Sequence, residues 1–285
     1  MTTLTTTPGT PGSPGTAGAT TAVATASSYA DRPVPAPIPF TRLLGVEMRK
    51  MFDTRSGLWM MASVAILAAL ASAAVVLWAP DSEVTYATFA SAVGFPMAVL
   101  LPVIAVLSVT SEWSQRNGLT TFTLVPHRGR VIAAKAVDAF VVAVAGMLVA
   151  AAVGVVGNLV GSALNGTDAV WDVTVSDFAA IVLANVLGVF MGFMLGVVLR
   201  SSPAALVGYL VVSFVLVPLS LALAAAQQWF ADLQPWVDWN FTKGELFNGL
   251  PTDGEYWAQL GVTTLAWLVL PLAYGLWRVV RAEVK

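Results

Sequence analysis

Residues 58–79 read LWMMASVAILAALASAAVVLWA, a run of 22 residues without a charged side chain. A helix needs about 20 apolar residues to cross the hydrocarbon core of a bilayer, so this run predicts a membrane-spanning helix. Five more such stretches follow, at 86–111, within 133–160 (with Asp138 in its opening turns), 178–199, 204–226 and 256–277. They are continuous rather than alternating, which excludes the strands of a transmembrane barrel. We therefore expect an all-α polytopic membrane protein with six transmembrane helices.

The composition of the whole chain agrees with a protein dissolved in lipid. Of its 285 residues, 57% are apolar and 11% charged, whereas soluble domains average about 45–50% and about 25%. The formal net charge of −2 excludes a general affinity for nucleic acid. The chain has no cysteine and one histidine, His127. Thiol chemistry is therefore excluded, and one histidine is too few for most His-based catalytic or metal sites. We expect no enzymatic activity, no metal site and no cofactor in this chain.

The placement of basic residues predicts the orientation in the membrane. Thirteen of the 14 basic residues lie in 1–57, 112–135, at Arg200 or from Arg278 onward, and the remaining loops hold ten acidic residues and one base, Lys243. The positive-inside rule puts the first group, with both termini, in the cytoplasm. Ten Arg against four Lys is typical of a GC-rich bacterial genome, so we expect the cytoplasmic membrane of a bacterium.

The chain ahead of the first span divides into two parts. Residues 1–39 contain ten Thr and seven Pro and are expected to form a disordered cytoplasmic tail, with a low-complexity binding tail as the alternative. Residues 40–57 are expected to form an amphipathic interfacial helix, and 58–285 the six-span domain. Leu44, Met48, Met51 and Phe52 share one helical face, and the polar remainder consists of Glu47, Arg49, Lys50, Asp53 and Arg55. A helix packed on protein instead of lipid is the alternative.

Residues 112–135 form the only sizeable loop on the cytoplasmic side. Glu112 opposes the helix macrodipole at the end of the second span, and Arg116, four residues on, is its nearest cation. The apolar stretch 119–125 carries Phe122 between a break at Gly118 and a stop at Pro126. Basic residues then anchor the entry to the third span: Arg128, Arg130 and Lys135. A solvated basic loop would explain the Arg and Lys residues but not the apolar stretch.

This loop resembles the corresponding segment of ABC-2-type transporter permeases. In that family an acidic residue at the end of the second span precedes a Gly/Thr-rich stretch, a proline, an arginine and a lysine, as in GLTTFTLVPHRGRVIAAK at 118–135. The interfacial helix resembles the elbow helix of the family, and WVDWNFTKGELFNG at 236–249 resembles the extracellular segment before its last span. The resemblance covers residues 40–285.

The resemblance implies the permease subunit of an ABC exporter, which pairs with a second copy or a paralogous permease. ATP and Mg²⁺ would bind to a separate cytosolic ATPase subunit, and the exported compound would be lipophilic or drug-like. The residues implied in coupling to the ATPase are Glu112, Arg116, Gly118, Phe122, Pro126, Arg128 and Lys135. A non-transporting membrane scaffold or sensor is the alternative function.

Small residues recur every four positions in two spans. The first series is Ala184, Gly188, Gly192 and Gly196, and the second is Gly157 and Gly161. Such spacing lets helix backbones approach closely, either within the subunit or at a dimer interface or substrate path. Four tryptophans are expected at the outer membrane interface or in an outer vestibule: residues 229, 236, 239 and 257. Four prolines are expected to kink their helices: residues 96, 102, 218 and 271.

Overall fold

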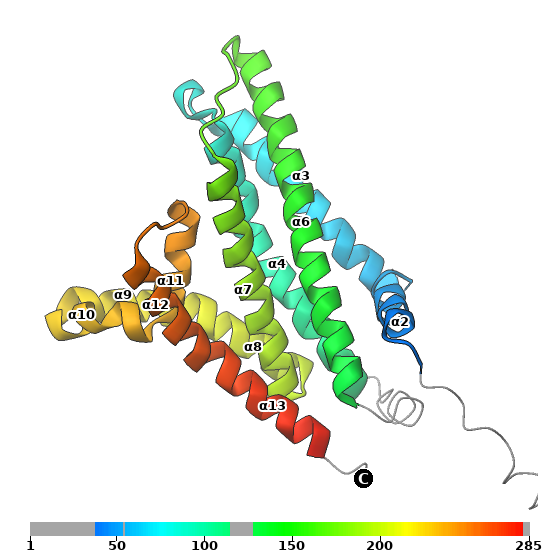
Figure 1. Ribbon diagram of the computed structural model, residues 1–285. Helices are drawn as coiled ribbons and strands as arrows, with labels where there is room; N and C mark the ends of the chain where they lie inside the picture. Colours follow the sequence, from blue (N-terminus) through cyan, green and yellow to red (C-terminus); the bar gives the residue numbers. More distant parts are fainter. Residues whose placement is uncertain (1–37, 54, 115–127, 282–285) are drawn as a thin grey trace, which may run out of the picture. The chain divides into compact units, whose positions relative to one another are not determined.

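The structure is a computed structural model that describes residues 38–53, 55–114 and 128–281 (Figure 1). The chain falls into two units, residues 1–38 and 39–285, and every described residue except Ile38 belongs to the second. The tail expected at 1–39 therefore lies almost wholly outside the described residues. Arg116, Gly118, Phe122 and Pro126 of the expected coupling loop also lie outside them.

The described residues form helices and no named strand. In chain order these are α2 (Phe40–Phe52), α3 (Arg55–Trp78), η1 (Asp81–Glu83), α4 (Tyr86–Ser114), α6 (Arg128–Asn165), α7 (Val175–Leu199), α8 (Ser202–Leu210), η2 (Val211–Val215), α9 (Leu216–Ala226), α10 (Gln228–Val237), α11 (Trp239–Glu245), η3 (Leu246–Asn248), α12 (Gly254–Thr264), η4 (Leu265–Val269) and α13 (Leu270–Arg281). Six helical segments are long and apolar enough to cross a membrane: Gly57–Trp78, Tyr86–Ser111, Gly129–Asn165, Val175–Leu199, Ser202–Ala226 and Gly254–Arg281. Each overlaps one apolar stretch of the sequence, so the prediction of an all-α protein with six candidate membrane spans is confirmed.

Several helix bounds differ from the expected ones, most clearly at α2, α3 and α6. The helix expected at 40–57 ends at Phe52, and Arg55 already belongs to α3. The helix α6, which contains the third span, begins at Arg128 and not at Ala133, because helical hydrogen bonding continues past the charged residues at which an apolar run stops. Lys135 and Asp138 consequently lie inside a long helix.

The fifth and sixth candidate spans are interrupted by π-helical turns. In the fifth, η2 separates α8 from α9, and in the sixth, η4 separates α12 from α13. Pro218 and Pro271 follow these turns within a few residues. Proline and π-turns are common causes of helix kinks, so these are the places where the two spans depart from regular α-helix.

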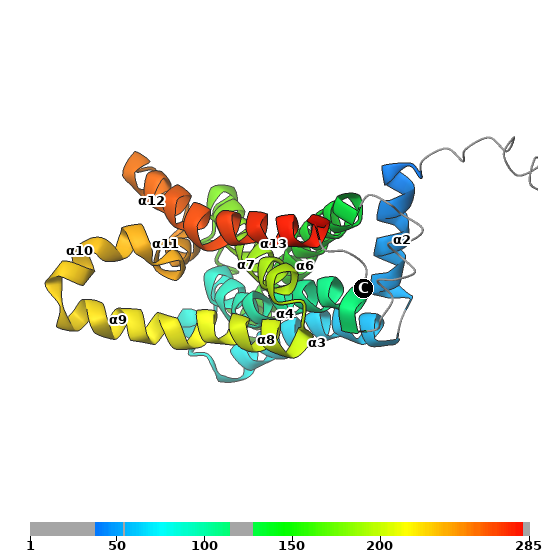
Figure 2. The same cartoon turned by 90° about the horizontal axis from the view of Figure 1, so that it is seen from below.

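The helix α4 lies at the centre of the packing. It packs against α3, α6, α7 and α8, and its buried side chains Met97, Leu101 and Ile104 join Met147 of α6 and Phe193 of α7 in the main hydrophobic core. The helix α9 differs, since none of its residues is buried. Figure 2 shows α9 and α10 extending away from α3, α4, α6 and α7.

A proline in α4 determines how α8 attaches to it. Pro102 has no N–H, so the carbonyl of Ala98, four residues earlier, has no helical partner. The buried Tyr209 of α8 donates its hydroxyl to that carbonyl at 2.6 Å. Because an unpaired carbonyl in hydrocarbon is costly, this bond fastens α8 to α4.

The glycine series place α7 and α6 against α4. A Cβ at Gly192 would lie 2.6 Å from the carbonyl oxygen of Pro102, and one at Gly196 would lie 3.3 Å from Cβ of Val109. At Gly188 the nearest atom, Cγ of Pro102, is 3.7 Å away. In α6, Gly157 and Gly161 both face the ring of Phe89, at 2.7 Å and 3.3 Å from the nearest ring atoms.

Gly192→Ala should lower stability, because the new methyl group meets backbone that cannot rotate away. Overpacking of this kind costs about 1–3 kcal/mol. Gly188→Ala is the matched control: it lies one turn away on the same helix, meets only ordinary contact, and gains helix propensity. Thermal unfolding in detergent measures both, and a control that is destabilised as much as Gly192→Ala would contradict the close approach.

Tyr209→Phe should cost about 1 kcal/mol, because it leaves the Ala98 carbonyl unpaired. In a Pro102→Ala background the same substitution should cost much less, since the introduced alanine supplies its own N–H to that carbonyl. The four variants form a double-mutant cycle in thermal unfolding. Equal costs in both backgrounds would show that the hydroxyl does not compensate for the proline.

Candidate functional site at the α2 end of the bundle

The helix α2 lies at the end of the bundle where α4 ends and α6 begins, which we call the α2 end (Figure 1). Its buried Leu43 packs against Val131 and Ala134 in the first turns of α6, and α2 also contacts α3. Arg49 and Lys50 in the last turn of α2 complement the negative end of its macrodipole. One face of α2 is therefore packed on protein.

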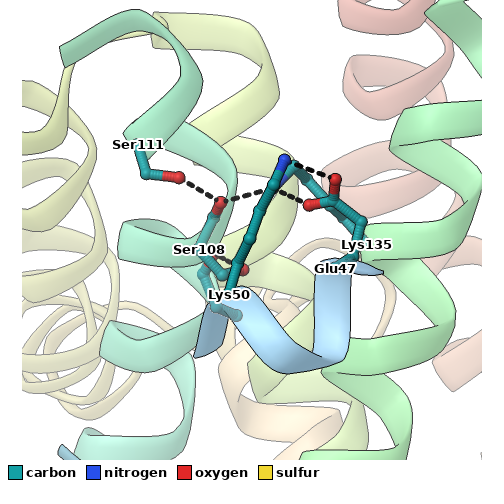
Figure 3. A network of polar contacts seen from close by, with 6 residues as sticks. Glu47, Lys50, Ser108, Ser111 and Lys135 are labelled. Carbon is teal, nitrogen blue, oxygen red and sulfur yellow. Dashed lines mark hydrogen bonds and ion pairs between the residues drawn. The ribbon is translucent and has the colours of Figure 1, made fainter. Parts of the chain in front are cut away.

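The polar centre of this face is Glu47, whose exposed fraction is 2% (Figure 3). Its Oε2 lies 2.6 Å from Nζ of Lys135 on α6, and its Oε1 accepts a hydrogen bond of 2.7 Å from Nζ of Lys50. Lys135 also donates to the carbonyl of Ser108 in α4 at 3.1 Å, and that carbonyl accepts a second bond from the hydroxyl of Ser111. One carboxylate and one ammonium thus join α2, α6 and α4.

The two lysines of this network differ in their surroundings. The Lys135 side chain is 7% exposed and that of Lys50 is 44% exposed. Two charges removed from water stabilise each other only through their mutual contact, and removing one partner leaves an uncompensated buried charge. An exposed pair is worth much less. The contact that matters energetically is therefore Glu47 with Lys135.

A second buried carboxylate lies one turn further along α6. Asp138 is buried, and the charges of both Glu47 and Lys135 act on it. Its Oδ2 has no hydrogen-bond partner among the described residues. Glu47, Lys50, Lys135 and Asp138 together carry two positive and two negative charges, so the cluster is formally balanced.

The same end of α4 is tied to α8. The hydroxyls of Thr110 and Ser202 lie 2.7 Å apart, and Thr110 also donates to the carbonyl of Val106. A polar connection therefore runs at the α2 end from α2 through α6 and α4 to α8.

The structure brings one expected coupling residue, Lys135, into this network. Glu112 lies in α4, which continues to Ser114, and Arg128 is the first residue of α6. The side chains of Glu112 and Arg128 lie outside the described residues. The two ends of the 115–127 segment are thus carried by helices that the Glu47 network joins.

Glu47 is expected on the polar side of its helix, and this prediction is wrong, since the residue is buried. On a helical wheel Leu43 extends the apolar arc of Leu44, Met48 and Met51, and Glu47 then falls inside this arc, between Leu43 and Met51. A carboxylate inside an apolar face requires a buried cation. Lys135, in the early turns of α6, is that cation.

At the opposite end, α11 carries a tryptophan and a lysine in contact. Trp239 was expected at the membrane interface, but it is buried and donates its indole N–H to Thr264 Oγ1 at 3.2 Å. The Lys243 ammonium lies 5.0 Å from the centre of the Trp239 ring, and burial lowers the pKa of Lys243 to about 8. Trp229, Trp236 and Trp257 are exposed, as side chains that meet lipid or headgroups would be.

Comparison with known proteins finds no matching family model, and no curated protein matches the sequence significantly.

Lys135→Met should destabilise the protein by about 3–5 kcal/mol, because Glu47 stays buried without its closest cation. Lys50→Met removes a cation from the same carboxylate but at an exposed position, and should cost less than about 1 kcal/mol. Thermal unfolding of the two purified variants compares them directly. Equal losses would mean that the carboxylate is not buried as described.

Proposed function

We propose that this chain is the permease subunit of an ABC exporter in a cell membrane. Two permease chains, identical or paralogous, would form the pathway for a lipophilic or drug-like compound. A separate cytosolic ATPase would bind ATP and Mg²⁺ and supply the energy. The chain itself would carry out no catalysis. The α2 end would face the cytoplasm, in agreement with the positive-inside rule.

The observation that carries the proposal is the buried contact between Glu47 and Lys135. A permease driven by another subunit needs a cytosolic contact point that is firmly connected to its membrane helices. The 115–127 segment leaves α4 after Ser114 and enters α6 at Arg128, and the Glu47 network joins both helices to α2. A force on this segment would therefore move α2, α4 and α6 together.

The packing of α4 supports a path from this segment to the rest of the bundle. The helix contacts α3, α6, α7 and α8, so displacement of its end would be felt by four other helices. Its attachment to α8 through Tyr209 and Ser202 would carry motion into the fifth span. That span has little contact with the bundle beyond α8, and it leaves an apolar surface for lipid or for the second permease chain.

Phe122→Ala should weaken binding of the ATPase, because Phe122 is the bulkiest apolar side chain in the 119–125 stretch. Truncating an anchor of this kind typically costs at least about 2 kcal/mol, or roughly 30-fold in affinity. Thr121→Ala, at the neighbouring position, is the control and should bind normally. Glu112→Gln should keep the ATPase bound but lower the stimulation of its ATP hydrolysis.

The measurement is purification of the tagged chain from its native membrane, with mass spectrometry of what accompanies it and an ATP-hydrolysis assay of the complex. An ATPase recovered with the wild type and with Thr121→Ala, but not with Phe122→Ala, supports the proposal. Recovery of no ATPase, or equal recovery with all variants, contradicts it and favours a membrane scaffold or sensor.

A further inference from the structure

Arg200 has the most unusual backbone among the described residues. It ends α7 in the left-handed conformation, with φ 54° and ψ 24°, and no other described non-glycine residue has a positive φ. Glycine is the usual residue at this place in a helix terminus, because a Cβ is disfavoured there. Strained positions of this kind are found where a side chain has a function.

The Arg200 guanidinium is partly enclosed and has no counter-ion among the described residues. Its Nε and Nη2 are buried without a hydrogen-bond partner among the described residues. Burial and the nearby charge of Arg278 both lower the pKa of Arg200. Neither arginine forms an ion pair with a described carboxylate. Two neighbouring guanidinium groups repel each other, so an anion bound between them would remove this electrostatic repulsion.

The packing of α7 and α13 fixes the position of the two arginines. A Cβ at Gly275 would lie 2.9 Å from a methyl of Val198 and 3.1 Å from one of Val197. Both helices end toward the α2 end of the bundle and cross at an oblique angle (Figure 1). Arg278 comes three residues after Gly275, and Arg200 three residues after Val197, so both arginines follow this helix contact within about one turn.

The surroundings of this pair are those of a lipid headgroup region. Tyr274 and Trp277 stack on each other on α13 and are 55% and 50% exposed. The guanidinium of Arg278 lies over the Tyr274 ring and that of Arg281 over the Trp277 ring. Exposed aromatic rings with arginines at the end of an apolar helix are typical of the membrane–water interface. In a bilayer, the anionic groups in the headgroup region are lipid phosphates.

We propose that Arg200 and Arg278 form a binding site for the headgroup phosphate of an anionic phospholipid. The planar guanidinium groups present paired N–H donors that match phosphate oxygens. The acyl chains would lie along the exposed side of α13, past Tyr274 and Leu270. Since the site is formed by α7 and α13 and not by the Glu47 network, it does not depend on the proposed transport function.

The test is thermal unfolding of the full chain in neutral detergent with added phosphatidylglycerol or phosphatidylcholine. Phosphatidylglycerol should raise the unfolding temperature in a saturable way, and phosphatidylcholine should not. Arg200→Gln and Arg278→Gln should each weaken the apparent affinity at least about tenfold, because each removes charge-assisted hydrogen bonds. Arg49→Gln, at an exposed position on α2, is the control for general attraction between basic residues and anionic lipid.

Arg200→Gly separates a binding role from a structural one. Glycine suits the left-handed backbone, so this variant should be at least as stable as the wild type without lipid, yet lose the response to phosphatidylglycerol. Three results would overturn the proposal: equal effects of both lipids, equal effects of the Arg49 and Arg200 variants, or a loss of lipid-free stability in Arg200→Gly. Inorganic phosphate and glycerol phosphate form a further arm, and protection equal to that by the lipid would assign the site to a soluble phosphate instead.

Discussion

The arrangement of this protein depends on one buried contact between opposite charges, that of Glu47 with Lys135. Each charge is costly in an apolar environment, and together they hold an amphipathic helix against the ends of two long apolar ones. Because the lysine also binds the Ser108 carbonyl, the contact joins α2, α6 and α4. The segment proposed to meet an ATPase is bounded by two of these helices. An external push there would act on the whole group and not on a single loose loop.

The number and approximate place of the spanning helices could be predicted from the sequence, because the length of an apolar run is limited by the thickness of the bilayer alone. The small-residue spacing in α7 likewise indicated a close helix approach, and Gly192 lies against the backbone at Pro102. The ends of the helices could be predicted less accurately, since a charged residue such as Lys135 ends an apolar run but does not end the helix. The helix α2 and the end of α13 lie toward one end of the bundle (Figure 1), and the cytoplasmic placement of that end stays a prediction.

The pairings between helices could not be predicted in the same way, because they depend on the rotation of each helix about its axis. Tyr209 and Ala98 are far apart in the sequence, and no sequence pattern identifies them as partners. The missing N–H of Pro102 indicates only that the Ala98 carbonyl needs another hydrogen-bond donor. The burial of Glu47 becomes predictable only when Leu43 is counted in the apolar face of α2, because Leu43 extends that face beyond Glu47. The segment 115–127, to which most of the coupling residues belong, lies outside the described residues, so their role stays a prediction.

The most direct measurement is a double-mutant cycle between Glu47→Met and Lys135→Met, read by thermal unfolding in detergent. Each single substitution leaves one buried charge without its partner, whereas the double variant leaves an apolar contact of similar volume. The account predicts that the double variant is more stable than either single one. If the two losses simply add, the carboxylate and the ammonium are not a buried pair, and α2 is not held to the bundle in the way described.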